Sequence, residues 1–566
     1  MATTEDRPKL IVGIDFGTTF SGVAWGLEDC PDDIELIQTW PGGGNITSQK
    51  VPTICSYDDK HMKWGYQIDQ SIHPAKEQRL IQGVKLLLDE SQKFRYAPCT
   101  DSQEVIKDLK KTPVKVAGDY LGKLVVHALD VLTRRFGTAL QTMDIEYILT
   151  VPAVWSDKGK DLTMQAAHQA GISSASLRLL SEPEAAAVYA IRTIQPNTVS
   201  EGDCLVVCDA GGGTVDIITY RVKQNDPLRF EEATKGTGAV CGSVMLDERF
   251  DGLVKDIIEE QSHQPVPQST VRAARKYWQD YIKPSYTGPL DEDEICEPGY
   301  WIPVPGVSGI SNVDLSEGHL YVDRDQVKQI FDPIVQEIEN LVAEQRKSVK
   351  AAGFPTKAII LVGGLGASGY LFKRLQSASD GIQIMQPPNA WSAVARGAVI
   401  RGQEGNQIES RIARCSYGVH TSIKFDPEMH RADEYLRWCP YEEEWKLDNR
   451  MTWHILKGNA VAESKPIRMS FYRVIGVGKS LVFHEILMFC QTGKAPAVRD
   501  DSVSKLCEME ADLSRIPKEL FTKKTNSKGT QFYHVSFDLV LTPTSASLLF
   551  DLQFNGVSYG SVRSRY

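Results

Sequence analysis

The sequence predicts an α/β protein that continues into an all-β domain. Strand-like and helix-like stretches alternate over residues 8–400, which is the pattern of an α/β architecture. Beyond residue 415 the helical pattern fades, and short apolar runs predict a β-sandwich. The chain of 566 residues is also too long for one ordinary domain. We therefore expect an α/β domain at 8–400, a polar linker at 401–415 and a β-rich domain at 416–566.

The elements of the α/β part follow one another in a regular order. A hairpin is predicted at 11–26, and apolar residues at helical spacing predict a helix at 117–136. The later predicted elements are a strand at 145–152, helices at 158–170, 179–191 and 327–352, a strand at 358–362 and a helix around 370–375.

The C-terminal part contains only strand-like runs. These predicted strands are 419–425, 451–456, 465–472, 481–489, 532–542 and 547–554. Asn555-Gly556 predicts a tight hairpin turn before a last strand at 557–562, because both residues adopt positive φ readily.

Two segments far apart in the chain share one pattern. Residues 11–22 and 205–218 each begin as an apolar, β-branched run that ends in an aspartate, Asp15 in the first and Asp209 in the second. Each then turns through glycines and a threonine. Glycine lets backbone N–H groups approach an anion, and aspartate offers the hard oxygen that a phosphate-bound Mg²⁺ needs. A single turn of this kind could be an ordinary hairpin, but two copies indicate the halves of a phosphate clamp.

Composition excludes several classes of protein. The net charge of −10 and the pI near 5.7 argue against a nucleic-acid binder. No apolar run approaches the roughly 20 residues of a membrane-spanning helix, and the polar N-terminus lacks the pattern of a signal peptide, so we expect no membrane insertion. The eleven cysteines are scattered without a C-x-x-C pair, which predicts free thiols and a cytoplasmic protein.

Five stretches occur in the order used by the 70-kDa heat-shock proteins, a family of actin-like ATPases. They are residues 13–21, 149–156, 180–187, 208–216 and 361–366. The third, Leu180-Ser-Glu-Pro-Glu-Ala-Ala-Ala187, resembles that family's Asn-Glu-Pro-Thr-Ala-Ala-Ala. Residues 389–398 are similar to its later connecting helix. Because the tail is β-rich without a helical lid, the whole resembles a divergent, lidless branch of the family.

The resemblance implies a two-lobed actin-like (ribonuclease H-like) domain, with lobes of roughly 8–200 and 201–400, that binds ATP or ADP with Mg²⁺. It implies that Asp15 and Asp209 face the metal through water. The residues implied to hold the nucleotide are Gly17, Thr18, Thr19, Phe20, Gly211, Gly212, Gly213, Thr214, Gly242, Gly363, Gly364, Leu365 and Gly366.

Hydrolysis is implied to depend on Lys85, Glu182, Asp209 and Thr214. Lys85 lies where the family places its catalytic lysine, although Lys76 or Arg79 could fill that role and Lys85 could instead lie on a helix surface. Glu182 precedes a proline at a predicted helix start, where it could cap the helix or face a metal-bound water.

The sequence departs from the family where the base would bind. The family follows its two glycines with serine and, soon after, an arginine that packs on the base, whereas this chain has Leu365-Gly366-Ala367. The helix that clamps the base elsewhere falls near 271–283. Its candidate cations are Arg275, Lys276 and Lys283. Nucleotide binding is therefore better supported than adenine specificity.

The leading hypothesis is an ATP-binding, chaperone-like protein that hydrolyses ATP slowly and binds a polypeptide through its C-terminal β domain. One alternative is a non-catalytic interaction protein that keeps the nucleotide as a structural ligand. A second is a small-molecule kinase of the same fold, which we expect less because such kinases lack the 181–187 motif and an all-β tail.

Overall fold

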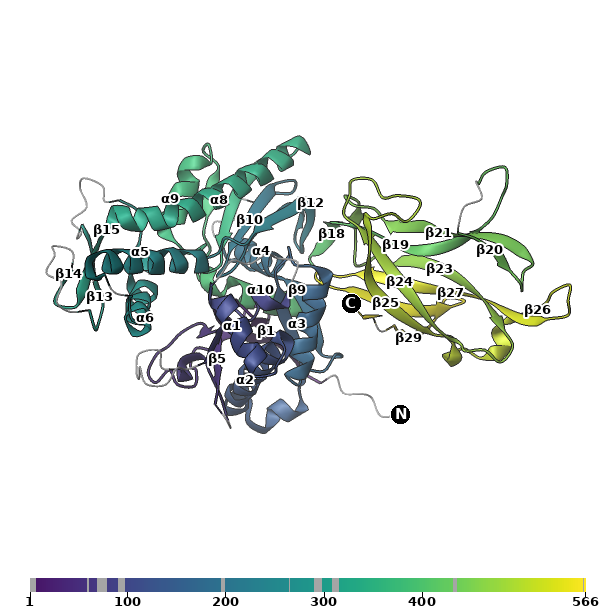
Figure 1. Ribbon diagram of the computed structural model, residues 1–566, viewed down its shortest axis with the longest axis horizontal. Coiled ribbons are helices and arrows are strands. Elements are labelled where there is room, and N and C mark those ends of the chain that lie inside the picture. The colour runs from purple at the N-terminus through teal and green to yellow at the C-terminus, as the bar shows by residue number, and fades with distance from the viewer. Residues whose placement is uncertain are drawn as a thin grey trace. The chain divides into compact units, whose positions relative to one another are not determined.

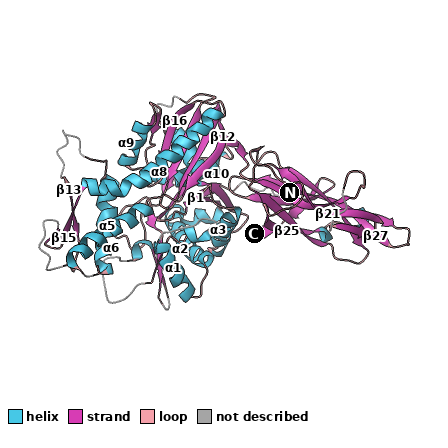
Figure 2. Cartoon of the chain, turned by 45° about the horizontal axis from the view of Figure 1, so that its top comes forward, coloured by secondary structure: helices cyan, strands magenta, loops and turns pink. Residues whose placement is uncertain are grey.

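The computed structural model describes residues 7–58, 61–68, 79–89, 97–194, 199–263, 265–289, 298–307, 315–430, 435–562 and 564–565. The chain divides into two units, Met1–Gln407 and Ile408–Tyr566. Helices are confined to the first unit among the described residues, apart from single 3₁₀ turns, and the second unit is built from strands (Figure 2). None of the described helices is long and apolar enough to cross a membrane.

The first lobe of the N-terminal unit is built on a mixed sheet with the strand order β3-β2-β1-β8-β9, and β4 also pairs with β2. Strand β1 is antiparallel to β2 and parallel to β8. The strands are β1 (Lys9–Asp15), β2 (Phe20–Leu27), β3 (Glu35–Leu36), β4 (Val51–Pro52), β8 (Asp144–Val151) and β9 (Leu177–Ser181). Both β1 and β8 are almost entirely buried, as their apolar sequences predict.

The second lobe repeats this plan. Its sheet has the order β17-β16-β10-β11-β12, with β10 antiparallel to β11 and parallel to β16. The strands are β10 (Cys204–Ala210), β11 (Val215–Asn225), β12 (Leu228–Ala239), β16 (Thr356–Val362) and β17 (Gln383–Met385). Each lobe therefore presents one antiparallel hairpin beside a parallel strand, and Figure 1 shows β1 and β10 near the centre of the unit.

Helices pack against both sheets. Helix α10 (Ala393–Glu404) packs on β1 and on α4 (Glu182–Thr193), so closely that a Cβ at Gly397 would lie 1.8 Å from the Ala185 carbonyl oxygen. The long α8 (Arg324–Ala351) covers β11 and β12. The other helices are α1 (Ala97–Asp108), α2 (Pro113–Phe136), α3 (Asp157–Gln169), α5 (Val244–Ser262), α6 (Gln268–Tyr277), α7 (Lys283–Ser285) and α9 (Gly369–Ala378), with a π-helix at Trp278–Ile282.

Two small sheets complete this unit. One has the order β6-β5-β7 and the other β13-β15-β14. Their strands are β5 (Ile54–Tyr57), β6 (Met62–Trp64), β7 (Leu80–Gln82), β13 (Gly299–Pro303), β14 (Leu315–Ser316) and β15 (His319–Asp323).

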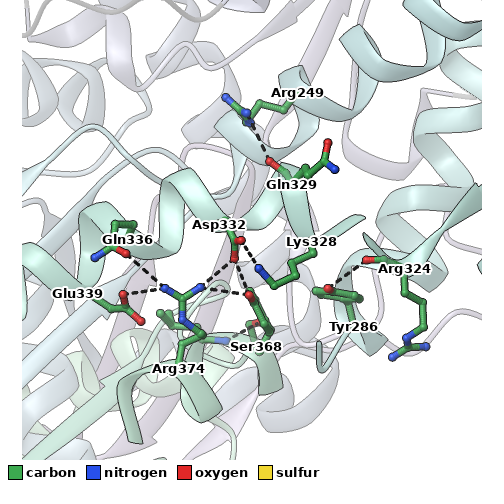
Figure 3. Close-up of polar contacts among 12 residues, drawn as sticks. Arg249, Tyr286, Arg324, Lys328, Gln329, Asp332, Gln336, Glu339, Ser368 and Arg374 are labelled. Atoms are coloured by element: carbon green, nitrogen blue, oxygen red, sulfur yellow. Dashed lines mark hydrogen bonds and ion pairs between the residues drawn. The ribbon is translucent and has the colours of Figure 1, made fainter. Parts of the chain in front are cut away.

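A polar network fixes α9 on α8. Arg374 of α9 donates to Asp332 and to Glu339 of α8, each at 2.8 Å, and Tyr370 also donates to Asp332 (Figure 3). Lys328 pairs with the same Asp332 carboxylate. Helix α9 begins three residues after the 363–366 turn, so this network anchors the segment that follows the turn.

The C-terminal unit contains two sheets with one apolar core between them. The sheets have the orders β20-β21-β19-β24-β25-β30 and β23-β27-β28-β29, with β26 paired to β27. Residues of both sheets share the core, among them Leu487, Met509, Phe537 and Phe550. The strands are β18 (Ile408–Ile412), β19 (Ser416–Lys424), β20 (Leu436–Cys439), β21 (Glu444–Ile455), β22 (Ala460–Val461), β23 (Ile467–Gly476), β24 (Val482–Cys490), β25 (Val503–Asp512), β26 (Thr522–Thr525), β27 (Gln531–Pro543), β28 (Leu548–Phe554), β29 (Val557–Ser561) and β30 (Ser564–Arg565).

Most predicted elements are confirmed, and the differences have physical causes. The helix predicted at 179–191 begins at Glu182, because Leu177–Ser181 pairs in parallel with β8. Asn555 and Gly556 have φ of 51° and 79°, as the predicted hairpin turn requires. The predicted linker region contains the end of α10 and the strand β18. Among the elements that had not been predicted are strands β12 and β25 and helices α1 and α5.

Candidate functional site

The two predicted phosphate turns close the two central hairpins. Across the first hairpin, Asp15 of β1 pairs with Gly22 of β2, and across the second, Asp209 of β10 pairs with Asp216 of β11. Asp15, Asp209 and Asp216 are 4%, 5% and 1% exposed. Each turn thus carries a buried carboxylate at the end of its first strand, and the second turn carries one on each strand. Asp216 lay in the sequence motif but was not predicted as a site residue.

The two turns meet in space. A Cβ at Gly213 would lie 2.6 Å from Thr18 Oγ1, and a Cβ at Gly212 would lie 2.4 Å from Thr19 Oγ1. Thr18 and Thr214 are themselves 6% and 7% exposed. Since real Cβ atoms do not approach other atoms so closely, glycine is required for the turns to touch. The structure therefore joins into one site two segments that are far apart in the sequence.

Two further turns adjoin the second hairpin. The amide of Gly242 donates to the Gly213 carbonyl at 3.2 Å, and the amides of Ser243 and Val244 donate to the carbonyls of Gly211 and Gly212. This contact places the start of α5 directly on the glycine turn. Gly242 therefore lies next to the 211–213 turn, with which it is predicted to hold the nucleotide.

The 363–366 turn lies on the other side of Asp209. A Cβ at Gly363 would lie 2.5 Å from Asp209 Oδ1, and the amides of Leu365 and Gly366 both donate to the Ala210 carbonyl. Gly17 closes the first turn, since a Cβ there would lie 2.1 Å from the Phe20 carbonyl oxygen. The backbone of the 363–366 turn therefore packs directly against Asp209 and Ala210, and the first turn is closed tightly on itself.

Trp391 connects the two sides of the site and had not been predicted. Its ring packs edge-on against Phe20, with ring centroids 5.6 Å apart, and its indole lies 3.6 Å from the position of a Cβ on Gly364. Trp391 follows Asn389 in the stretch compared with the connecting helix, but a lone tryptophan there carries no distinguishing signal.

Lys85 and Glu182 form a buried ion pair. Lys85 Nζ donates to Glu182 Oε1, and the lysine is 3% exposed, so it does not lie on a helix surface. Lys85 Nζ also lies 5.7 Å from the centre of the Trp155 ring. Ser181 occupies the N-cap position of α4, and the Glu182 carboxylate instead reaches Lys85. Of the two rival cations, Arg79 is exposed, and Lys76 lies outside the described residues.

A second buried lysine, Lys50, was not predicted. Its Nζ donates to Asp15 Oδ2 at 2.6 Å, and the residue is 6% exposed. It lies in the polar segment before β4, where neither periodicity nor the family motifs single it out. Two lysines thus face the buried carboxylates, Lys50 at Asp15 and Lys85 at Glu182.

Crowding of carboxylates perturbs their protonation. Burial raises the pKa of Glu182 to about 7; the Lys85 ammonium opposes this rise, and the charges of Asp15 and Asp216 add to it. Burial also raises the pKa of Asp209 well above its usual range, and the charges of Glu182, Asp216 and Asp15 raise it further. A cation brought into the site would relieve this repulsion.

The buried carboxylates give the site hard oxygen donors of the kind that Mg²⁺ prefers. Within the described ranges, no three histidine, cysteine, aspartate or glutamate side chains converge closely enough to hold a metal ion. The Trp155 indole N–H is also buried without a hydrogen-bond partner in the described part of the chain. Hard carboxylate oxygens together with an unused donor fit a Mg²⁺ ion that is carried by phosphate oxygens and water.

The three candidate base-binding cations are all engaged in ion pairs. Arg275 makes a two-point contact with Asp251, Lys283 donates to the buried Asp247 at 2.7 Å, and Lys276 pairs with Asp280 at the surface. Beside them Trp278 is fully buried and stacks on Phe250 with centroids 4.6 Å apart. This region is therefore organised by internal pairs.

Comparison with known proteins agrees with the predicted fold class. Residues 11–226 match the family model described as Hsp70 protein, and residues 411–565 match a domain of unknown function (DUF8568). The chain is 25% identical over 520 residues to heat shock 70 kDa protein 12A of Homo sapiens, covering 76% of this chain and 75% of that relative. It is 24% identical over 524 residues to heat shock 70 kDa protein 12B of Homo sapiens, covering 76% and 74%.

A bacterial relative is similar over a shorter region. The chaperone protein HscA homolog of Mannheimia succiniciproducens is 32% identical over 270 residues, which cover 45% of this chain and 38% of that relative. The predicted fold class, an actin-like nucleotide-binding domain followed by a β-rich region, is confirmed. The chain is a divergent member of the 70-kDa heat-shock protein family.

Proposed function

We propose that this protein binds Mg·ATP or Mg·ADP between the two lobes and hydrolyses ATP slowly. The observation that carries the proposal is the contact between the two glycine–threonine turns, Gly212 against Thr19 and Gly213 against Thr18. Backbone amides and threonine hydroxyls from both turns are thereby close enough to serve one chain of phosphates. The family relationship supports nucleotide binding, and the buried cations and carboxylates support turnover.

Each charged residue has a proposed task in this site. Asp15 and Asp209 would hold a hydrated Mg²⁺, which would neutralise phosphate charge when bound. Lys85 contacts the terminal phosphate and remains tied to Glu182, which orients it. Glu182, with its pKa raised to about 7, can accept a proton from an attacking water near neutral pH. Thr214 and the amides of the 211–213 turn hold the transferring group, because phosphoryl transfer depends mainly on positioning and charge neutralisation.

The remaining turns are proposed to hold the rest of the nucleotide. Gly242 supports the 211–213 turn, and Gly363, Gly364, Leu365 and Gly366 pass close to the nucleoside and its first phosphate. Trp391 lies beside Gly364 and packs against Phe20, so it offers aromatic surface next to this turn. The C-terminal unit is proposed to bind a polypeptide, and the free cysteines of the described residues support a cytoplasmic location.

The test begins with the purified full chain. Its nucleotide content is measured after denaturation, and its melting temperature is measured with and without millimolar Mg·ATP and Mg·ADP, since a ligand of the native state raises the melting temperature. We expect a shift with both nucleotides, or co-purified nucleotide. A nucleotide-free protein whose melting curve does not move contradicts the proposal.

A non-catalytic nucleotide-binding protein is the second candidate. It is favoured by the base-binding region, where Arg275 and Lys283 are committed to Asp251 and Asp247. Single-turnover hydrolysis with the enzyme in excess over labelled ATP separates the two candidates. We expect slow release of phosphate for an ATPase, and binding without phosphate release for a structural ligand.

Polypeptide binding needs its own measurement. The full chain is presented to an array of unrelated peptides in its nucleotide-free and Mg·ADP states, and the affinities of captured peptides are then measured by fluorescence anisotropy. Saturable binding supports the proposal. The absence of saturable binding to any peptide in either state removes the polypeptide part of the proposal and leaves the nucleotide part intact.

A further inference from the structure

Both the backbone and the side-chain stem of Lys50 are fixed by neighbouring residues. The Lys50 carbonyl accepts hydrogen bonds from the Ser48 hydroxyl at 2.7 Å and from the Tyr66 hydroxyl at 3.3 Å. Its side-chain stem lies over Gly22, where a Cβ would come within 3.1 Å of Lys50 Cγ. Gly22 is the partner of Asp15 across the first hairpin. Because Gly22 has no side chain, there is room for the Lys50 side chain to pass over it and reach Asp15.

The Lys50 ammonium lies among carboxylates of both lobes whose charges repel one another. Its Nζ is 2.6 Å from Asp15 Oδ2 and 6.0 Å from the centre of the Trp391 ring. Its charge also lowers the pKa of Asp209 on the other lobe, against the larger upward effect of burial. Lys50 therefore belongs to the same electrostatic site as both residues proposed to face Mg²⁺.

Four carboxyl groups and two lysines share the described site. The carboxylates of Asp15, Glu182, Asp209 and Asp216 are buried there, and the lysines that face them are Lys50 and Lys85. An ammonium has three N–H donors, and the contacts among described residues use one donor of Lys50, on Asp15. The other two donors of the Lys50 ammonium are therefore available for further hydrogen bonds.

We propose that Lys50 supplies, from within the protein, part of the positive charge that Mg²⁺ otherwise brings, so that the site binds nucleoside di- and triphosphates without metal. This inference rests on the proposed function. Lys50 keeps its hydrogen bond to Asp15 through one N–H group and donates its other N–H groups to phosphate oxygens. One oxygen of Asp15 already accepts a hydrogen bond from Lys50. Mg²⁺ therefore adds less to nucleotide affinity here than in a site where neither metal-facing carboxylate is paired with a lysine.

The first test uses the unmodified full chain. Isothermal titration with ATP is carried out in excess Mg²⁺ and again in excess EDTA. We expect the dissociation constant in EDTA to be less than tenfold weaker than in Mg²⁺. A weakening of tenfold or more overturns the inference. If ATP does not bind under either condition, the proposed function itself has failed, so the two failures are distinguishable.

The second test changes the lysine. Lys50→Met keeps most of the stem and removes the charge, and it should weaken metal-free ATP binding at least tenfold. Lys50→Arg should weaken it less than Lys50→Met, because the positive charge is retained. Equal metal-free affinities in the wild type and Lys50→Met would overturn the inference.

Lys9→Met is the matched control. Lys9 lies at the opposite end of β1 and also pairs with carboxylates, Glu28 and Glu146. Its loss should leave metal-free binding unchanged. Melting curves of all variants without ligand establish that each is folded. If Lys50→Met does not fold, the comparison of EDTA and Mg²⁺ in the wild type still decides the question.

Discussion

Asp209 and Asp216 are direct cross-strand partners in the β10–β11 hairpin, and both side chains are buried. In the β1–β2 hairpin, Asp15 is paired instead with Gly22. The second lobe therefore concentrates negative charge at its turn. Such an arrangement costs stability in the free protein, and a bound cation or a cationic side chain offsets that cost.

Asp209→Asn should make the free protein more stable and less responsive to ligand. The substitution removes a buried charge that is repelled by Glu182, Asp216 and Asp15. We expect a higher melting temperature without ligand and a smaller rise on adding Mg·ATP, both read by differential scanning calorimetry. Glu201→Gln, at an exposed position before β10, should change neither value. A free protein destabilised by Asp209→Asn would contradict this reading of the cluster.

Lys85→Met should slow hydrolysis while leaving nucleotide binding measurable. Loss of one preorganised charge at a phosphoryl-transfer site costs on the order of a hundredfold in rate. Single-turnover phosphate release and titration calorimetry measure the two effects separately. The exposed Arg79, changed to methionine, is the control. If Lys85→Met turns ATP over at the wild-type rate and Arg79→Met does not, the catalytic cation has been misassigned.

Gly213→Ala should disrupt the contact between the two turns. Its Cβ would fall 2.6 Å from Thr18 Oγ1 and 2.9 Å from Leu86 Cδ2, and overpacking of this kind costs about 1–3 kcal/mol. We expect both a lower melting temperature and loss of the nucleotide-induced shift. Gly252→Ala is the matched control, because no atom lies within 4 Å of its Cβ position in α5, and alanine there should stabilise slightly. A normal nucleotide shift in Gly213→Ala would show that the turns do not act together.

The nucleotide-free protein should lose stability as the pH rises toward neutrality. Burial raises the pKa of Glu182 from an ordinary 4.5 to about 7, so folding favours the protonated carboxyl. The stabilisation is complete below pH 4.5 and is lost as the pH passes through about 7, by up to roughly 3 kcal/mol. Urea unfolding at a series of pH values measures this loss. Glu182→Gln should show a flatter profile, whereas the exposed Glu104→Gln should follow the wild type.

The sequence was sufficient to predict both hairpin turns, because their apolar runs, glycines and terminal aspartates are local features. It also indicated Lys85 and Glu182 through the family resemblance, although their contact spans 97 residues. Nothing local marks Lys50, which lies in a polar segment and gains its role only when that segment crosses Gly22. Trp391 likewise becomes relevant only through its packing against Phe20.

Tertiary pairing decides a helix boundary and a set of ion pairs that the sequence did not show. Leu177–Ser181 is a short apolar run that could extend a helix, but pairing with β8 makes it a strand. The cations near 271–283 were named as base-binding candidates from the family resemblance, and the sequence did not show that Lys283 and Arg275 pair with Asp247 and Asp251 of another helix. A sequence shows which charges exist, and the fold decides which of them neutralise each other.

Because Gly213 packs against Thr18, the site can form only after both turns have been synthesised. Thr18 emerges from the ribosome early, but Gly213 emerges only after the whole first lobe. A nascent chain or a proteolytic fragment that holds one turn has no place for the ligand and gains no protection from it. Cellular nucleotide would therefore prolong the lifetime of finished molecules selectively and leave incomplete ones to the degradation machinery.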